Sequence, residues 1–372
     1  MARVLMVSKP VVEPWNDSGK NLVRDLAGGL RRHRPTLMLP DRASCPVEGA
    51  DVLRVYPSAI PEGFALRRVD QARVMGRLLV SRGHDLWHFF FAPNPPALAA
   101  GRLCRAVRRK PVIHTVCSAP RDARAVVSAL FADVHVVLSR HTAERLEEAG
   151  LPADRMRRIP PMVSLPDGTL SHRAALGRQA RHSLGIPAAQ PYVLYPGDLE
   201  FGGGARCMLS VARALADRGV ALVMACRAKT AAAAQVAREL QAEGEPLTRR
   251  GLLYWAGNTS HIHGLLAAAE VVCLPSRELY AKMDYPLVLL EAMALSIPVV
   301  VAAGGAAAEL AESGGALVCE PRAEPLCDVL LGLLEDERAR SLQGQAGCAR
   351  AAADFSPGVV AQVHERLYDS LI

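Results

Sequence analysis

Short apolar runs alternate with amphipathic segments along most of the chain. In the first half, apolar runs of four to six residues are separated by segments with helical periodicity. This alternation is typical of strand–helix–strand units that form a parallel sheet. The predicted strands are 3–8, 36–39, 52–56, 86–91, 111–116, 134–138 and 156–159, and the clearest helices are 21–32, 97–108 and 140–149.

The same pattern begins again after residues 164–191, a segment that mixes Pro and Gly turns with a basic helical patch and that we interpret as a linker. Two α/β units in succession predict two Rossmann-like doubly wound domains, 1–180 and 190–354, that face each other across a cleft. Because parallel sheets bind ligands at the carboxyl ends of their strands, such a cleft favours an enzyme with two substrates. In the second unit, strands are predicted at 192–198, 220–226, 252–257, 271–276, 298–302 and 315–319, and helices at 205–218, 231–241, 260–269, 286–294, 306–313 and 324–334.

The composition is that of a globular protein, with 50% hydrophobic and 22% charged residues among 372. No apolar run reaches the roughly 18 to 20 residues that span a bilayer. The opening MARVLMVS has strand character and lacks the features of a signal peptide. The nine Cys residues include no CxxC pair, which indicates buried free thiols in a reducing compartment. We therefore expect a cytoplasmic protein.

The charge is distributed unevenly. Residues 1–170 contain 26 Lys and Arg against 16 Asp and Glu, a net of +10, whereas residues 171–372 contain 18 against 21, a net of −3. A basic first half suggests an anionic partner, either an acidic acceptor or peripheral contact with the inner membrane face. Arg-rich solvated helix faces would give the same imbalance. We do not expect a nucleic acid partner.

The segment KPVVEPWNDSGKNLV, residues 9–23, follows the first strand and superficially resembles a phosphate-binding P-loop. A P-loop needs Gly at position 14 and Ser or Thr at position 21, where this chain has Pro14 and Asn21. No GxGxxG follows either first strand, which disfavours a dehydrogenase. We interpret the segment as a polar loop at the cleft whose predicted acceptor-binding residues are Asn16, Asp17, Ser18, Gly19 and Lys20.

The stretch VVCLPSRELYAKMDYPLVLLEAMALSIPVVVAAGGAAAEL, residues 271–310, closely resembles the donor-site segment of retaining GT-B glycosyltransferases of the family-four type. The flanking segments LLYWAGNTSHIHGLLAAAE and SGGALVCEPRAEPLCDVLLGLLED resemble the adjoining units of that family. In the first half, ADVHVVLSRHTAERLEEAGLPADRMRRIPPMV resembles the end of the family's first domain. The tail FSPGVVAQVHERLYDSL resembles its terminal helix, so we expect residues 355–372 to cross back to the first domain.

The family carries two Glu residues in an E-x7-E motif within the donor segment. The second, which binds the nucleotide ribose in the family, matches Glu291. The first, which touches the donor sugar, falls on Met283, and we expect the flanking Lys282 and Asp284 to take over part of its catalytic role.

The Arg and Lys that clamp the donor diphosphate in the family fall on Asp198 and on Gly203 or Gly204. Backbone N–H groups of EFGGGAR, at a predicted helix start, and of the Gly pair at 304–305 could hold phosphate instead. Positive charge would come from Lys282, Arg227 and Lys229. The predicted donor-binding residues are Gly197, Gly202, Gly203, Gly204, Arg227, Lys229, Asn258, Ile262, Met283, Tyr285, Pro286, Leu287 and Glu291.

In the first domain the family places a His near the reacting centre, and this position falls on Cys117. His114 lies three residues earlier, on the opposite face of a strand, and we interpret it as a buried structural residue. His88 resembles a His often found at a strand end in the family and is a candidate on the acceptor side. We do not expect Cys117 to be a covalent nucleophile, because no pattern of His or Asp residues would activate it.

The resemblance implies a hexosyltransferase of carbohydrate biosynthesis that retains anomeric configuration and uses neither a metal nor a cofactor. Its substrates would be a nucleotide sugar and a lipid-linked, polysaccharide or small-molecule acceptor. The altered positions Cys117, Met283 and Asp198 leave open a non-catalytic or repurposed GT-B protein that binds a sugar nucleotide or glycan. A sugar-nucleotide epimerase would need carboxylates and His residues facing the donor, which the sequence does not place.

Overall fold

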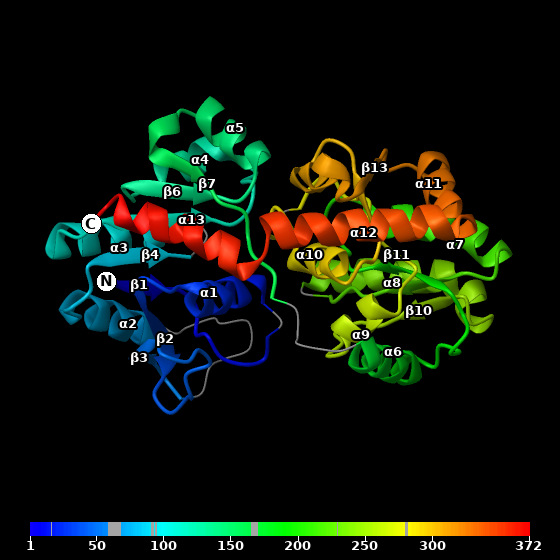
Figure 1. The fold of residues 1–372 in the computed structure, drawn as a ribbon, viewed down its shortest axis with the longest axis horizontal. Helices are drawn as coiled ribbons and strands as arrows, with labels where there is room; N and C mark the ends of the chain where they lie inside the picture. The colour runs from blue at the N-terminus through cyan, green and yellow to red at the C-terminus, as the bar shows by residue number, and fades with distance from the viewer. Residues whose placement is uncertain are drawn as a thin grey trace. The chain divides into compact units, whose positions relative to one another are not determined.

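The computed structural model describes residues 1–15, 17–58, 68–90, 93, 95–164, 170–228, 230–279 and 282–372. The chain forms two compact α/β units (Figure 1). The first contains Met1–Met162, Ala281–Asp284 and Asp354–Ile372, and the second contains Val163–Tyr280 and Tyr285–Ala353. The sequence placed residues up to 180 in the first domain, whereas helix α6 (Leu170–Leu184) packs on α9 (Ile262–Ala267) of the second unit.

The first unit is built on a parallel sheet with the strand order β3-β2-β1-β4-β5-β6-β7. Its first six strands have the doubly wound Rossmann order, which confirms the predicted fold class for this unit. The order reverses between β1 and β4, so loops that leave these strands meet at the carboxyl edge of the sheet. The strands are β1 (Arg3–Val7), β2 (Arg34–Pro40), β3 (Asp51–Tyr56), β4 (Leu86–Phe89), β5 (Val112–Val116), β6 (Val134–Val137) and β7 (Met156–Arg158).

Helices cover both faces of this sheet (Figure 1). Alternation along β4 directs Trp87 and Phe89 into an apolar core shared with α2 and α3, while His88 points to the opposite face and contacts Tyr368 of α13. Helix α13 packs on α1. The helices of this unit are α1 (Ser18–Gly29), α2 (Arg68–Val80), α3 (Pro95–Arg108), α4 (Ala123–Ser128), α5 (Arg140–Glu148), η2 (Ala153–Arg155) and α13 (Pro357–Asp369).

The second unit repeats the Rossmann order in a parallel sheet, β10-β9-β8-β11-β12-β13, which confirms the second doubly wound domain. The strands are β8 (Tyr192–Tyr195), β9 (Ala221–Met224), β10 (Leu253–Trp255), β11 (Val271–Leu274), β12 (Val299–Ala302) and β13 (Leu317–Cys319). Besides α6 and α9, the helices are α7 (Gly204–Asp217), α8 (Ala231–Arg249), α10 (Leu287–Ala294), η3 (Ala306–Gly314), α11 (Ala323–Glu335) and α12 (Glu337–Asp354). None of the helices within the described ranges is long and apolar enough to cross a membrane.

Candidate functional site

The switch point of the second sheet brings two loops together at the carboxyl ends of β8 and β11. A Cβ on Gly202 would lie 2.6 Å from the backbone oxygen of Glu278, and a Cβ on Gly204 would overlap Ser276 Oγ. Gly202 also has φ of 73°, in the left-handed region. Only glycine therefore allows the loop after β8, which we call the glycine loop (residues 196–204), to lie directly on Ser276 and Glu278.

The glycine loop leads into the N-terminus of α7, a helix of 14 residues. Its N-cap, Gly203, adopts φ of 67° and supplies no side chain to cap the helix. The first backbone N–H groups of a helix have no intrahelical partner, and the helix dipole gives that end partial positive charge. Together with the buried hydroxyl of Ser276, these groups form an arrangement that suits an anion such as a phosphate.

Asp198 shapes the glycine loop from within. Its Oδ1 accepts hydrogen bonds from the backbone N–H groups of Glu200 at 2.8 Å and Phe201 at 3.2 Å. The Tyr195 hydroxyl donates to the Asp198 carbonyl oxygen at 2.7 Å, and a Cβ on Gly197 would overlap the Tyr195 ring. The carboxylate at the position of the family's Arg thus stabilises a turn within the glycine loop.

Cationic side chains do occur on the loops around the glycine loop. Arg227 lies after β9, and Thr230 on the same connection donates to Glu200 at 2.6 Å, which joins the two loops. Lys229 lies outside the described residues. Arg277, which is not among the residues predicted from the sequence, directly follows Ser276. Its Nε donates to the Ala303 carbonyl oxygen at 3.0 Å, and its guanidinium pairs with Glu320.

The backbone of Arg277 also lies against the second predicted amide cluster, the Gly304–Gly305 pair. A Cβ on Gly305 would lie 2.5 Å from the Arg277 backbone oxygen, and Gly304 has φ of 81°. The position of Arg277, immediately after a buried strand that ends in Pro-Ser, is the sequence signal that could have identified it.

Glu291 lies on α10, with its side chain largely buried. His263 of α9 approaches it, with Nε2 3.4 Å from Glu291 Oε1. His263 is not among the residues predicted from the sequence, although it lies within the segment that resembles the family's nucleotide-base region. The imidazole of His263 thus holds the Glu291 carboxylate, and this carboxylate can accept hydrogen bonds from hydroxyl groups.

The remaining predicted donor residues divide into buried and accessible ones. Tyr285, Pro286 and Leu287 are buried at the start of α10, and the Tyr285 hydroxyl donates to buried Glu309 at 2.6 Å. Asn258 is exposed after β10, and Ile262 is half-buried at the start of α9. The buried residues therefore support α10, while the accessible ones are available to a ligand.

Asp284 lies in the first unit, at the N-terminus of α5. It is 1% exposed, and its oxygens accept from the Ala119 N–H at 2.7 Å and the Ser139 hydroxyl at 2.6 Å. Burial raises the pKa of Asp284, although hydrogen bonds from Ser139, Thr142 and Ala119 oppose the shift. Because both oxygens are engaged inside the protein, Asp284 positions the loop and does not itself present a carboxylate to a sugar.

The residues beside Asp284 differ in accessibility. Met283, at the position of the family's first Glu, is 4% exposed, and Lys282 is half-buried. Of Lys282, Met283 and Asp284, Lys282 is thus the residue whose charged group remains partly accessible.

The first unit brings Cys117 close to Asp284, whose backbone N–H donates to the Cys117 carbonyl oxygen at 3.0 Å. Burial and the Asp284 charge raise the pKa of Cys117 to about 12, so its side chain is a neutral thiol. His114 is fully buried and stacks on Phe131, with ring centroids 5.1 Å apart.

His88 is enclosed on the α13 side of the sheet. Its ring nitrogens lie 2.9 Å from the Tyr368 hydroxyl and 2.7 Å from Thr115 Oγ1, and its side chain has no exposed area. Burial lowers the pKa of His88 well below its ordinary value. These contacts assign His88 to the interior, where an acceptor does not reach it.

The predicted acceptor loop forms the start of α1. Asp17 caps this helix by accepting from the N–H groups of Gly19 at 2.9 Å and Lys20 at 3.2 Å. Burial opposes ionisation of Asp17, but bonds from Lys9, Lys20 and Gly19 outweigh it and lower its pKa. Since the Asp17 carboxylate occupies the helix N-terminus, a phosphate does not bind there as in a P-loop; Ser18 is exposed, and Asn16 lies outside the described residues.

Comparisons with known families account for most of both units. Residues 20–166 match the family described as Glycosyltransferase Family 4, and residues 190–336 match Glycosyl transferases group 1. Two doubly wound sheets with these matches define a glycosyltransferase of the GT-B class. The chain belongs to the family-four type of these enzymes.

Solved structures of this fold align with the chain over almost its full length. HepE from Anabaena in complex with UDP-glucose is 18% identical, with a TM-score of 0.72 and coverage of 100% of both chains. Sucrose-phosphate synthase from Thermosynechococcus elongatus is 18% identical, with a TM-score of 0.71 and coverage of 100% of this chain and 99% of that one. Starch synthase IV from Arabidopsis thaliana, bound to ADP and acarbose, is 14% identical, with a TM-score of 0.73 and coverage of 99% of both. No curated protein matches the sequence.

Proposed function

We propose that this glycosyltransferase transfers a hexose from a nucleotide sugar to an acceptor, with retention of anomeric configuration and without a metal ion. The observation that carries the proposal is the anion-binding arrangement at the β8/β11 switch point. There, the uncapped N-terminus of α7 follows a glycine loop that lies against Ser276. This is the edge of a doubly wound sheet where ligands bind.

Each part of this arrangement has a task in holding a nucleotide diphosphate. The α7 amides hold phosphate oxygens, and Arg227 and Arg277 supply positive charge from the neighbouring loops. Glu291 accepts hydrogen bonds from ribose hydroxyls, with His263 orienting its carboxylate. The choice of donor is supported by HepE, described in complex with UDP-glucose, and by starch synthase IV, described with ADP.

The chemistry requires no protein nucleophile. In a retaining GT-B enzyme the leaving phosphate can itself take the acceptor proton, so the protein positions both substrates and stabilises charge on the leaving group. The first unit fits this division of labour: Cys117 is a neutral thiol, His88 is enclosed, and Asp284 is bonded internally.

The acceptor class that we propose remains broad: a lipid-linked, polysaccharide or small-molecule acceptor. The exposed Ser18 at the start of α1, near the carboxyl end of β1, supports acceptor binding at this edge of the first sheet. The basic composition of residues 1–170 supports peripheral contact with an anionic membrane.

A second candidate function is a GT-B protein that binds a sugar nucleotide or glycan without turnover. Two substitutions relative to the family favour it. Met283 is buried at the position of the sugar-binding Glu, and Asp198 stabilises a turn at the position of the phosphate-binding Arg. Both changes would weaken contact with the donor while leaving the fold intact.

Binding and turnover of sugar nucleotides separate these functions. The protein would be incubated with UDP-, ADP- and GDP-linked hexoses, and both the thermal unfolding midpoint and nucleotide release would be followed. A ligand at about 100 times its Kd stabilises the folded state by about 2.7 kcal/mol, and this stabilisation raises the thermal unfolding midpoint measurably. Stabilisation with slow nucleotide release supports transfer, stabilisation without release under any acceptor supports the binding protein, and no stabilisation contradicts both.

Glu291→Ala tests the ribose assignment. It should abolish the stabilisation by nucleotide, whereas Glu243→Ala, an exposed substitution on α8, should leave it unchanged. Equal stabilisation of Glu291→Ala and the native protein would remove Glu291 from the site.

A further inference from the structure

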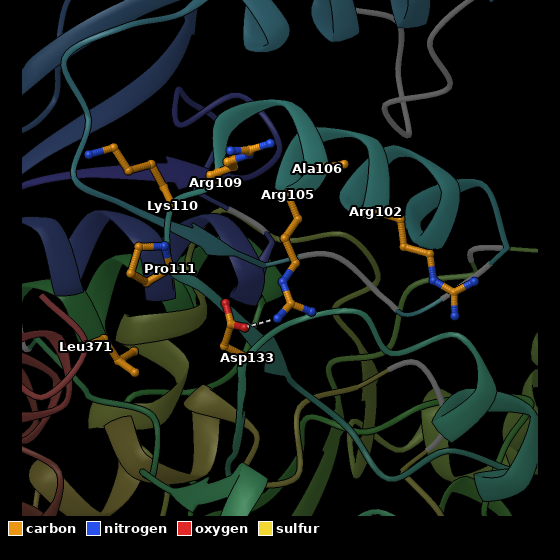
Figure 2. Close-up of a pocket in the computed structure, with 8 residues that line it drawn as sticks. All are labelled: Arg102, Arg105, Ala106, Arg109, Lys110, Pro111, Asp133 and Leu371. Carbon is orange, nitrogen blue, oxygen red and sulfur yellow. Dashed lines mark hydrogen bonds and ion pairs between the residues drawn. The ribbon is translucent and has the colours of Figure 1, made fainter.

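The first unit contains a hollow at the edge opposite to the proposed substrate-binding edge of its sheet. Its volume is about 860 Å³, and it lies beside Pro111, just before β5, and Asp133, just before β6. The amino ends of the strands form this edge, away from the loops where Cys117 and Asp17 lie. Figure 2 shows its lining residues: Arg102, Arg105, Ala106, Arg109, Lys110, Pro111, Asp133 and Leu371.

The hollow carries an excess of positive charge. Residues 95–110 contain five Lys and Arg and no Asp or Glu. Arg105 reaches from α3 to pair with Asp133, the one carboxylate among the lining residues that the structure describes (Figure 2). Arg102, Arg109 and Lys110 have no carboxylate partner among the residues that the structure describes. Three exposed cations thus surround one local ion pair.

Exposed apolar side chains accompany these cations. Leu103 is 46% exposed and Val107 is 53% exposed, and their spacing of four residues places them together on α3. At the other side of the hollow, Leu371 lines the wall and the adjoining Ile372 is 61% exposed. Apolar and cationic side chains therefore lie together on this surface.

We propose that this surface, the α3 face (Arg102, Leu103, Val107, Arg109, Lys110 and Ile372), docks on an anionic lipid bilayer. A lipid phosphate enters the hollow and is held by Arg102, Arg109 and Lys110, while Leu103, Val107 and Ile372 insert into the headgroup–acyl boundary. The apolar residues favour a bilayer over a soluble polyanion or a nucleic acid, since either of those would leave them in water. Among the described residues that line the hollow, none has an aromatic side chain that could stack on a base.

This docking surface is separate from the proposed catalytic residues. The α3 face lies at the amino edge of the first sheet, and the proposed nucleotide-binding residues lie in the second unit. Binding to the bilayer and nucleotide release should therefore respond to different substitutions. If the protein did not bind the bilayer, the proposed transferase function would still stand, and the reverse also holds.

The test is flotation of the full chain with vesicles of phosphatidylcholine alone and of phosphatidylcholine mixed with phosphatidylglycerol. We expect binding to the anionic vesicles only, reversed by high salt. The double variant Arg102→Glu with Lys110→Glu should weaken this binding on the order of 30-fold or more. Each basic residue near an anionic surface raises the affinity about fivefold, and the two substitutions also introduce negative charge. Leu103→Ser with Val107→Ser should leave weaker binding that is lost at lower salt than for the native protein.

The matched charge control is the double variant Arg213→Glu with Arg250→Glu, at exposed positions on α7 and at the end of α8. It should bind the anionic vesicles like the native protein. Thermal unfolding of each variant and its nucleotide release should stay at the native level. Equal binding to both vesicle types, unchanged binding of the Arg102/Lys110 variant, or binding of inorganic phosphate or duplex RNA with no binding to vesicles would overturn the proposal.

Discussion

The Ser139 hydroxyl donates a hydrogen bond to Asp284 Oδ2 over 2.6 Å, although the two residues are 145 positions apart in the chain. Ser139 is also the N-cap of α5, where its oxygen accepts from the Thr142 N–H. Asp284 thus places a carboxylate beside a helix N-terminus, where the helix dipole favours negative charge. This pair fixes the segment that includes Lys282 and Met283 in the first unit.

Removal of the Asp284 carboxylate should destabilise the first unit. Asp284→Ala leaves the Ser139 hydroxyl and the Ala119 N–H buried without acceptors, and each such loss costs about 1–3 kcal/mol. In Asp284→Asn, the side-chain oxygen can still accept from the Ala119 N–H, and the side-chain NH2 can donate to Ser139 Oγ. This variant should therefore lose about 1 kcal/mol or less of its unfolding free energy. Urea unfolding of both variants measures the difference, and equal loss in the two would show that the bonds to Asp284 contribute little.

The sequence could not have placed Asp284 in this way. Its motif position suggested a contact with the donor sugar, because the segment around it resembles a ligand-binding loop. The bonds that engage it come from Ala119 and Ser139, which follow strands of the first sheet and become neighbours only after folding. Spacing along the chain carries no information about such a contact.

Three buried histidines should make the first unit sensitive to acid. Burial lowers the pKa of His135 to about 3 and that of His364 to about 3, and it lowers the pKa of His88 well below its ordinary value. Between about pH 6.5, where an unfolded histidine titrates, and about pH 3, the unfolded chain binds more protons than the folded one. Stability is therefore complete above pH 6.5 and is lost as the pH falls, by up to about 2 kcal/mol per histidine at pH 5.

Urea unfolding at pH 7 and pH 5 measures this loss. His364→Gln should reduce the difference between the two pH values, because it removes one of the titrating groups. His182→Gln, at an exposed position on α6, should leave the difference as it is in the native protein. A first unit whose stability is the same at both pH values would contradict the role of the buried histidines.

The glycine loop should respond to substitution more strongly where it touches the loop that follows β11. Gly202→Ala would place a Cβ 2.6 Å from the Glu278 backbone oxygen, in addition to the cost of φ at 73°. Gly219→Ala is the matched control, since Gly219 has φ of 70° and nothing within 4 Å of its Cβ. Both should lose about 1 kcal/mol from backbone strain.

Only Gly202→Ala should also displace the loop and weaken nucleotide binding, by about tenfold or more. Titration of a nucleotide against both variants, by calorimetry, separates the two effects. If both bound the nucleotide as the native protein does, the contact with Glu278 would not position the site.

Parts of the site could be read from the sequence because they depend on local pattern. Fully buried runs such as Val271–Leu274 identified the sheet, and the Gly202–Gly204 triplet and Glu291 followed from motif positions. The basic helical patch within residues 164–191 is α6, but it is part of the second unit and not of a linker, because it packs on α9, a contact that spacing along the chain does not show. His263 was missed because its partner lies on another helix.

Cys117 should behave as an inert thiol despite its position near the predicted reacting centre. With a pKa of about 12, on the order of 0.01% of its side chains are thiolate at pH 8, against about a quarter for an ordinary cysteine. Alkylation by iodoacetamide at pH 8, followed by peptide mass spectrometry, should therefore label Cys117 at least 100-fold more slowly than a small free thiol. Cys45, also half-buried, provides a comparison within the same chain.

Cys117→Ser should then leave nucleotide release within about threefold of the native rate, because the neutral side chain supplies neither a nucleophile nor a base. Rapid labelling of Cys117, together with loss of nucleotide release on labelling and in Cys117→Ser, would show that the thiol is ionised and takes part in the reaction. Rapid labelling alone would mean that the Asp284 segment moves away from Cys117 in solution. In that case Asp284→Ala should lose little stability in urea unfolding, because the contacts of Asp284 would rarely be made.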